Sequence, residues 1–210
     1  MLVVSRLWLK ANASLTSGTM SDHLPSSVLR FWFGAGEEYG RRDKRWFKKD
    51  ASFDAELSRR FLPLYEKLVA GAGREWLESR ADCLARIIAL DQFPRQMFRG
   101  APRAFAADPL ALEAARHAVT RGYDRNMLPV ERMFTYLPFE HSESLEDQLK
   151  ACELTAPLAA FPETEDAPRY ALLHRDIIQR FGRFPHRNAA LGRASTPEEI
   201  EFLKRPGSGF

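Results

Sequence analysis

A helix with a marked start and a marked end occupies residues 108–122, which read DPLALEAARHAVTRG. Asp108 is predicted to be its N-cap, because the carboxylate of a capping aspartate accepts hydrogen bonds from the backbone N–H groups that open a helix. Pro109 follows at the first helical position, where the missing N–H is not needed, and Gly122 ends the helix. The stretch therefore predicts one complete helix.

Similar helix start and stop signals continue along the chain, and no run of residues alternates between apolar and polar as a strand would. Residues 196–199, TPEE, are a capping box that opens a short C-terminal helix. Pro63 is expected to kink the second helix, and Pro138 to break a later one. The other predicted helices span residues 25–33, 52–71, 75–92, 129–136, 143–160 and 168–181.

Seven to nine helices joined by short loops predict an all-α fold for a single domain over residues 20–210. Residues 1–19 contain Arg6 and Lys10 but no acid. They do not have the charged start and unbroken apolar core of a secretory signal. We expect a disordered leader, or a wrongly assigned start with translation beginning at Met20.

Composition and charge exclude several classes of protein. The 210 residues include 31 Lys and Arg against 28 Asp and Glu, a net charge of +3 that falls to +1 without residues 1–19. No helix shows a continuous Lys/Arg stripe, so nucleic acid is not an expected partner, and no stretch of 18 apolar residues predicts a membrane span. Cys83 and Cys152 are expected to be free thiols in a reducing, cytoplasmic compartment, with a bridge between them as the alternative.

Charge is segregated within the chain. Residues 169–193 carry six arginines against one acid, and residues 140–153 carry five acids against one lysine. One interpretation is that the two segments pair across helices through arginine–carboxylate hydrogen bonds. The other is that some arginines are left over and form a cup for a phosphate or carboxylate ligand.

A faint internal repeat places Phe-Pro and then cations after an apolar helix end. The first copy is residues 93–95, FPR, and the second is residues 184–187, FPHR. Repeated helix pairs are typical of solenoid-like α folds. The simplest interpretation is structural: Phe93 and Phe184 pack in the core, and the prolines that follow them end helices.

Residues 139–143, FEHSE, form an acid–histidine–acid cluster beside a helix break. His141 is a candidate proton-transfer residue, with Glu140 or Glu143 as its orienting carboxylate. The alternative is a histidine that caps the next helix. No metal site is predicted, because zinc needs three or four ligands at characteristic spacings, which are absent here.

Six motifs together resemble one bacterial family, the domain of unknown function 924 family. They are LRFWFG (29–34), RWFKKDASFD (45–54), LDQFPRQMFRG (90–100), AFAADPLAL (104–112), YLPFEHSE (136–143) and RFGRFPHRNAALGRASTPEE (180–199). The resemblance covers nearly all of residues 24–204 and implies an α-helical, TPR-like array of antiparallel helix pairs, with no established activity. The family's polar motifs fall here on Asp91, Gln92, Arg95, Arg99, His141, Ser142, Glu143, Arg183, His186, Arg187, Asn188 and Arg193.

Three hypotheses about function follow. The first is a binding or scaffold protein for a protein or peptide partner. The second is a small-molecule protein or hydrolase-like enzyme without a cofactor, in which Arg95, Arg187 and Arg193 hold an anion, and His141 or His186 moves a proton with Glu143 beside them. The third is a structural lock in which each polar group satisfies another. In the second hypothesis the ligand-binding candidates are Asp91, Gln92, Arg95, Arg99, Arg183, Arg187, Asn188 and Arg193, and the catalytic candidates are His141, Glu143 and His186.

Overall fold

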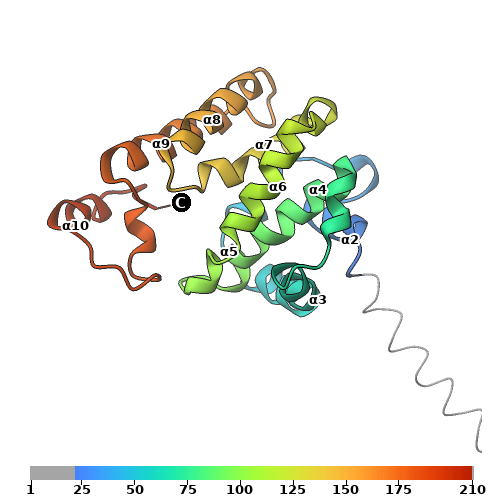
Figure 1. Cartoon of the computed structure of the whole chain (residues 1–210), viewed down its shortest axis with the longest axis horizontal. Coiled ribbons are helices and arrows are strands. Elements are labelled where there is room, and N and C mark those ends of the chain that lie inside the picture. Colours follow the sequence, from blue (N-terminus) through green and yellow to red (C-terminus); the bar gives the residue numbers. More distant parts are fainter. Residues whose placement is uncertain (1–21, 210) are drawn as a thin grey trace, which may run out of the picture.

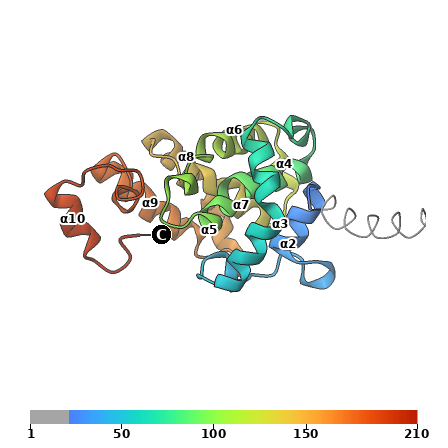
Figure 2. The same cartoon turned by 90° about the horizontal axis from the view of Figure 1, so that it is seen from below.

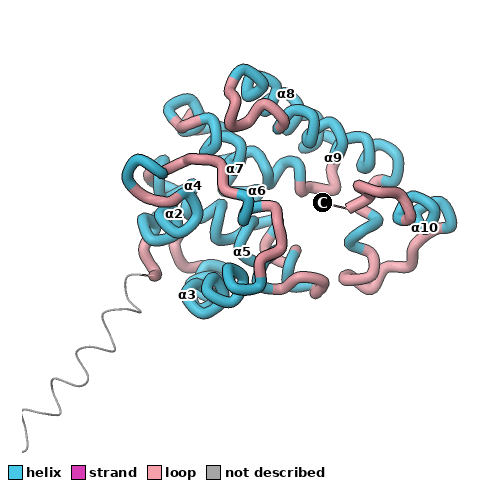
Figure 3. Tube along the Cα trace, turned by 180° about the vertical axis from the view of Figure 1, so that it is seen from behind, coloured by secondary structure: helices cyan, strands magenta, loops and turns pink. Residues whose placement is uncertain are grey.

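The computed structural model describes residues 22–209, and the expected leader at residues 1–19 and start at Met20 lie outside them. Within the described part the chain is helical, and Figure 3 shows helices joined by loops, with no strand. The longer helices are α2 (Pro25–Phe33), α3 (Ala51–Val69), α4 (Arg80–Ile87), α6 (Asp108–Thr120), α7 (Pro129–Glu140), α8 (Leu145–Thr155) and α9 (Ala167–Phe181). The shorter ones are α5 (Phe93–Met97) and α10 (Pro197–Leu203). This confirms the all-α prediction.

Neighbouring helices pack in pairs, and α8 and α9 lie side by side along one edge of the molecule (Figure 1). Successive contacts join α6 to α7 and α7 to α8, while α4 packs on α6 and α3 on α5. Figure 2 shows that α10 and the segment before it form one end of the molecule, far from α2 and α3. Packing of this kind is consistent with the TPR-like arrangement that the resemblance implies.

The main core lies where α2, α3, α5 and α7 meet. Trp32 of α2 packs edge-on against Phe134 of α7, with ring centroids 5.5 Å apart, and also contacts Phe93 at 5.8 Å. Offset and edge-to-face contacts of this kind add to the stabilisation that aromatic burial provides. Phe93 and Phe184 are both completely buried, as the sequence predicts.

Two differences from the expected helix boundaries matter for the site. Asp108 is the first residue of α6 rather than its N-cap, which is Ala107, and no side chain caps this helix. Helix α7 continues past Pro138 to Glu140, so this proline does not break it. The Asp108 carboxylate is therefore available for other partners, and Glu140 is carried into the interior.

Residues 75–92, predicted as one helix, are divided. A 3-10 turn (Arg74–Glu78) precedes α4, whose N-cap Ser79 accepts a hydrogen bond from the Asp82 N–H. The chain then continues into the π-helical turn η4 (Ile88–Gln92), which leads into α5. Single π-turns inside helices occur frequently at functional sites, and this one carries Asp91.

Among residues 22–209, none of the helices combines the length and the apolar character that crossing a membrane requires.

Candidate functional site

Five polar side chains from five segments of the chain meet in the interior, and we call this set the polar cluster. Its members are Asp91 (η4), Arg95 (α5), Asp108 (α6), His141, which follows α7, and Arg187, from the 3-10 turn η8 (Pro185–Arg187).

Asp91 holds His141 in place. The Asp91 side chain is 0% exposed, and its Oδ1 lies 2.7 Å from His141 Nδ1. Burial by itself would raise the pKa of Asp91, but Arg95 and the His141 contact outweigh it and keep that pKa below its usual value. Because an ionised carboxylate only accepts hydrogen bonds, His141 Nδ1 carries the proton. Burial and then Arg95 lower the pKa of His141 against the opposing effect of Asp91, which favours the neutral ring.

Asp108 joins the two arginines. Arg95 donates through Nη1 to Asp108 Oδ1 at 2.9 Å and through Nη2 to Oδ2 at 3.1 Å. Arg187 donates through Nη1 to the same Oδ2 at 3.1 Å. Arg95 Nη1 also lies 3.2 Å from Asp91 Oδ1, so the two carboxylates and two guanidinium groups form one continuous set of ion pairs.

Arg187 is the most deeply buried cation of the polar cluster, with 6% of the residue exposed. Its guanidinium carbon lies 4.7 Å from the centroid of the Phe105 ring and 4.5 Å from that of Phe184. The Arg187 Nε atom is buried and has no hydrogen-bond partner among residues 22–209. Burial lowers the pKa of Arg187 to about 10, against the opposing effect of Asp108. The positive charge is therefore only partly compensated.

Three further titratable groups surround the polar cluster. Burial, and then the neighbouring Asp91 carboxylate, raise the pKa of Glu140 to about 8, so this carboxyl group is protonated at neutral pH. Burial lowers the pKa of His174 to about 3 and that of His186 to about 4, and Arg187 adds to both shifts. His174 and His186 are therefore neutral at physiological pH.

A second set of polar side chains, which we call the C-terminal network, ties α10 and residues 182–196 to the rest of the molecule. Glu143 accepts from Arg193 Nη1 at 2.7 Å and from the Phe184 backbone N–H at 2.7 Å. Arg183 donates to both carboxylate oxygens of Glu199. The remaining member is Asn188, which accepts from Arg193 Nε and donates to Glu199. These groups satisfy one another, as the structural-lock hypothesis describes.

The predicted site residues thus lie in the polar cluster, in the C-terminal network or outside both. Asp91, Arg95, His141 and Arg187 meet in the polar cluster, where Gln92 donates to Asp91, and the His186 ring lies beside Phe184. Arg183, Asn188, Arg193 and Glu143 belong to the C-terminal network. Arg99 lies apart from both sets and pairs with Asp54 of α3.

Two features of the site differ from the sequence-based interpretation. The carboxylate that orients His141 is Asp91, and neither Glu140 nor Glu143 does so. Asp108, which the sequence predicts only as a helix cap, connects the two arginines. The sequence signal at Asp108, an aspartate before a proline, is the same for a cap and for a buried ion-pair partner.

The charged segments 140–153 and 169–193 pair with each other through only one arginine, Arg193 with Glu143. Three other arginines of the basic segment pair with acids outside both segments, Arg180 with Glu198, Arg183 with Glu199 and Arg187 with Asp108, and Arg175 pairs with Asp176 inside its own segment. In the described part of the chain, most arginines of residues 169–193 therefore do not pair with the carboxylates of residues 140–153.

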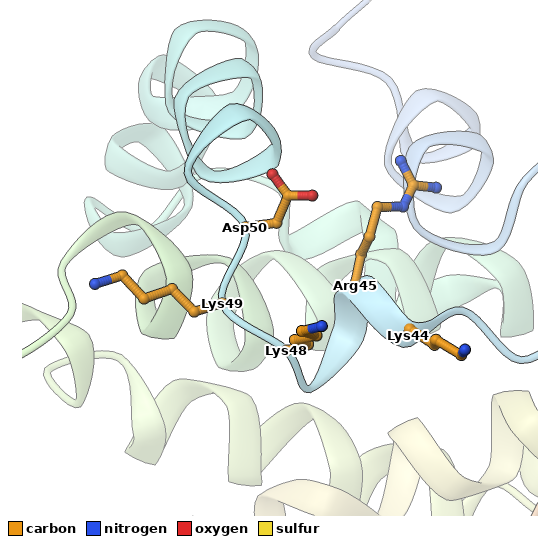
Figure 4. Close-up of a pocket in the computed structure, with 5 residues that line it drawn as sticks. All are labelled: Lys44, Arg45, Lys48, Lys49 and Asp50. Carbon is orange, nitrogen blue, oxygen red and sulfur yellow. The ribbon is translucent and has the colours of Figure 1, made fainter.

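A solvent-open pocket of about 330 Å³ lies elsewhere, beside the start of α3, and is lined by Lys44, Arg45, Lys48, Lys49 and Asp50. Figure 4 shows that these side chains point in different directions and do not converge. Asp50 is occupied as the N-cap of α3, and Arg45 is held by Asp43. The pocket therefore does not show the arrangement of a specific site.

No group of three or more His, Cys, Asp or Glu side chains in residues 22–209 is arranged to hold a metal ion.

The fold and the polar cluster together define an all-helical protein with a buried arginine–aspartate–histidine set at the meeting point of distant segments. Residues 28–207 match the family described as "Bacterial protein of unknown function (DUF924)", and the chain belongs to this family. Its fold is similar to that of a solved protein of unknown function from Agrobacterium tumefaciens, with 40% sequence identity and a TM-score of 0.77. That similarity covers 86% of this chain and 96% of the other. No curated protein matches the chain.

Proposed function

We propose that the protein binds a small phosphate- or carboxylate-bearing molecule at the polar cluster, with Arg187 and Arg95 as the anion-binding residues. The observation that carries the proposal is that Arg187 is a buried cation with an unmet hydrogen-bond donor. Its guanidinium is almost fully buried, shares its single carboxylate oxygen with Arg95, and has Nε without a partner among the described residues. Buried donors are normally hydrogen-bonded, so an unmet donor on a buried cation points to a missing acceptor.

The charge balance supports the same conclusion. Asp91 is occupied by His141, Gln92 and Arg95, so Asp108 is the one carboxylate that contacts both guanidinium groups. Burial and then Arg187 lower the pKa of His186, with smaller effects of His141 and Arg95 in the same direction, and the effects of the two arginines indicate a positive potential at this place. An anion placed against Arg187 Nε would reduce that potential and satisfy the donor.

Access to the polar cluster is through its less buried members. The Arg95 side chain is 18% exposed, that of Asp108 17% and that of His141 13%, whereas Asp91 is fully enclosed. Arg95, Asp108 and His141 are therefore the members that a ligand would reach from solvent, and Asp108 holds Arg95 and Arg187 in position.

The test is a titration of the full chain with inorganic phosphate, followed by thermal unfolding and isothermal titration calorimetry. Phosphate at about a hundred times its Kd should stabilise the wild-type protein by about 2.7 kcal/mol. Arg187→Gln should lose most of this effect, and the matched control Arg99→Gln should keep it, because Arg99 pairs with Asp54 outside the polar cluster.

Arg95→Gln provides a second variant in case Arg187→Gln does not fold, which circular dichroism will establish. Equal phosphate stabilisation of the wild type and of both folded variants would overturn the proposal. So would the absence of binding to the wild type of phosphate, sulfate and short carboxylates alike.

The cytoplasm is the compartment expected for this function, and it is supported by the two free thiols of Cys83 and Cys152. The scaffold hypothesis remains a prediction, to be tested by the binding of a protein partner.

A further inference from the structure

We infer that the anion bound at the polar cluster is one that itself carries an O–H group, such as hydrogen phosphate or a hydroxycarboxylate, because His141 presents a hydrogen-bond acceptor beside the arginine donors. This inference rests on the proposed function and narrows its ligand class.

The first step is the state of the His141 ring. Its Nδ1 donates to the Asp91 carboxylate at 2.7 Å, which fixes the proton on Nδ1. In a neutral imidazole the other nitrogen, Nε2, then has a lone pair and no proton, so it accepts a hydrogen bond. His141 Nε2 has no partner among residues 22–209, and the side chain is partly open to solvent.

The second step is that burial and Arg95 outweigh the nearby carboxylates and favour the neutral His141 ring. Each element packed around it contributes a titratable or charged group. Arg95 from α5 disfavours protonation of His141, and Asp91 from η4 favours it but is already occupied by the Nδ1 proton. The other groups are Asp108 from α6, Glu140 from α7, His174 from α9, and His186 and Arg187 from η8.

Among these groups the carboxylates are engaged. Asp108 accepts from both arginines, and Asp91 accepts from His141 and Gln92. Glu140 is protonated at neutral pH and is almost fully buried. A ligand at this site therefore faces guanidinium donors together with the open acceptor His141 Nε2.

The third step compares that pattern with the chemistry of anions. Sulfate and acetate offer only acceptors, so an oxygen of either placed against His141 Nε2 would leave two acceptors facing each other. Hydrogen phosphate and glycolate offer acceptors to the arginines and an O–H donor to His141. A polar group left without a partner in a buried site is strongly disfavoured, which makes such a site selective.

His141 and Arg187 are connected by two separate sets of contacts. One runs through hydrogen bonds and ion pairs, from His141 to Asp91, Arg95, Asp108 and Arg187. The other runs through rings: the His141 and His174 centroids are 6.0 Å apart, and those of His174 and Phe184 are 5.7 Å apart. Phe184 in turn lies against the Arg187 guanidinium.

The experiment measures binding of two matched pairs of anions to the full chain by calorimetry at about pH 8, where phosphate is mainly a dianion that keeps one proton. Phosphate is compared with sulfate, and glycolate with acetate, so that size and charge are similar within each pair. The protic member of at least one pair should bind about tenfold more tightly. If only phosphate is preferred over sulfate, the ligand is a hydrogen phosphate. If only glycolate is preferred over acetate, the ligand is a hydroxycarboxylate.

His141→Leu should abolish the preference and retain weak binding of sulfate through the arginines. Equal affinities within both pairs in the wild type would overturn this inference while leaving the proposed anion site intact. Failure of all four anions to bind would overturn the proposed function itself.

A second measurement needs no variant. In a ¹⁵N spectrum of histidine-labelled protein, His141 should carry its proton on Nδ1, and phosphate should shift the Nε2 resonance. His117 is an internal reference for a ring with its proton on Nε2. Its Nε2 lies 3.0 Å from the Leu77 carbonyl oxygen and must donate to it, because a carbonyl oxygen only accepts. A proton on Nε2 of His141 would contradict the inference even if His141→Leu does not fold.

Discussion

Arg95 and Arg187 donate hydrogen bonds to the same carboxylate, that of Asp108, although they come from distant parts of the chain. Each arginine follows a Phe-Pro pair whose phenylalanine is completely buried, Phe93 in one case and Phe184 in the other. The pair opens α5 in the first case and the 3-10 turn η8 in the second, and the arginine that follows contacts Asp108 of α6. The weak sequence repeat thus corresponds to a convergence of two cations on one acid.

The role of Asp108 is tested by Asp108→Asn. Removing its charge leaves two buried cations with less compensation, so the variant should lose about 3 kcal/mol of unfolding free energy, measured by urea denaturation. It should also gain more stabilisation from phosphate than the wild type does, since the polar cluster becomes more positive. Asp54→Asn is the matched control on the half-exposed Arg99 pair. A smaller phosphate effect in Asp108→Asn would contradict the electrostatic argument.

Glu140 makes stability depend on pH in a defined direction. Burial raises its pKa from 4.5 to about 8, so the folded protein retains this proton over a range in which the unfolded chain has lost it. Its contribution to stability is fully present below pH 4.5 and is lost as the pH rises through 8.

Glu140→Gln keeps a neutral side chain at every pH. The unfolding free energy of the variant relative to the wild type should therefore increase as the pH rises from 4.5 to 8, by up to about 1.4 kcal/mol per pH unit. Urea unfolding at several pH values provides the measurement. A difference that stays constant with pH would show that Glu140 titrates normally.

Glu143 is expected to be structural. Glu143→Gln weakens the bonds to Arg193 and to the Phe184 N–H, so it should lower the unfolding free energy by about 2 kcal/mol. Hydrogen exchange at the Phe184 amide should accelerate, while phosphate affinity stays close to the wild-type value. Glu153→Gln, on the exposed Lys150 pair, should change neither. Loss of phosphate binding with unchanged stability would instead place Glu143 at the ligand.

The two cysteines should differ in reactivity. Cys83 is fully buried, and burial raises the pKa of its thiol to about 12, whereas Cys152 is only partly buried. Because the thiolate is the reactive form, iodoacetamide should modify Cys152 in the native protein and Cys83 only after unfolding. Mass spectrometry of labelled peptides measures this, and Cys152→Ser is the control. Native labelling of Cys83 would contradict the packing of α4 on α6.

Much of the fold could be predicted from local patterns. Pro25–Phe33 is a helix with the predicted bounds, and the TPEE capping box opens α10 with both of its hydrogen bonds present. Such signals are local, because a cap or an N1 proline acts on backbone groups within one turn. Pro138 shows the limit: α7 continues through it, which local propensity does not predict.

The sequence by itself determined the all-helical class, the family and most residues of the polar cluster, since residue types and short motifs carry that information. Only the tertiary structure decided which residues meet. It joined His141 to Asp91, assigned Asp108 to two arginines, and separated Glu143 and Arg193 into the C-terminal network. The physical reason is that a carboxylate accepts equally well from a helix end, a histidine or an arginine. Which of these it meets depends on how distant helices pack.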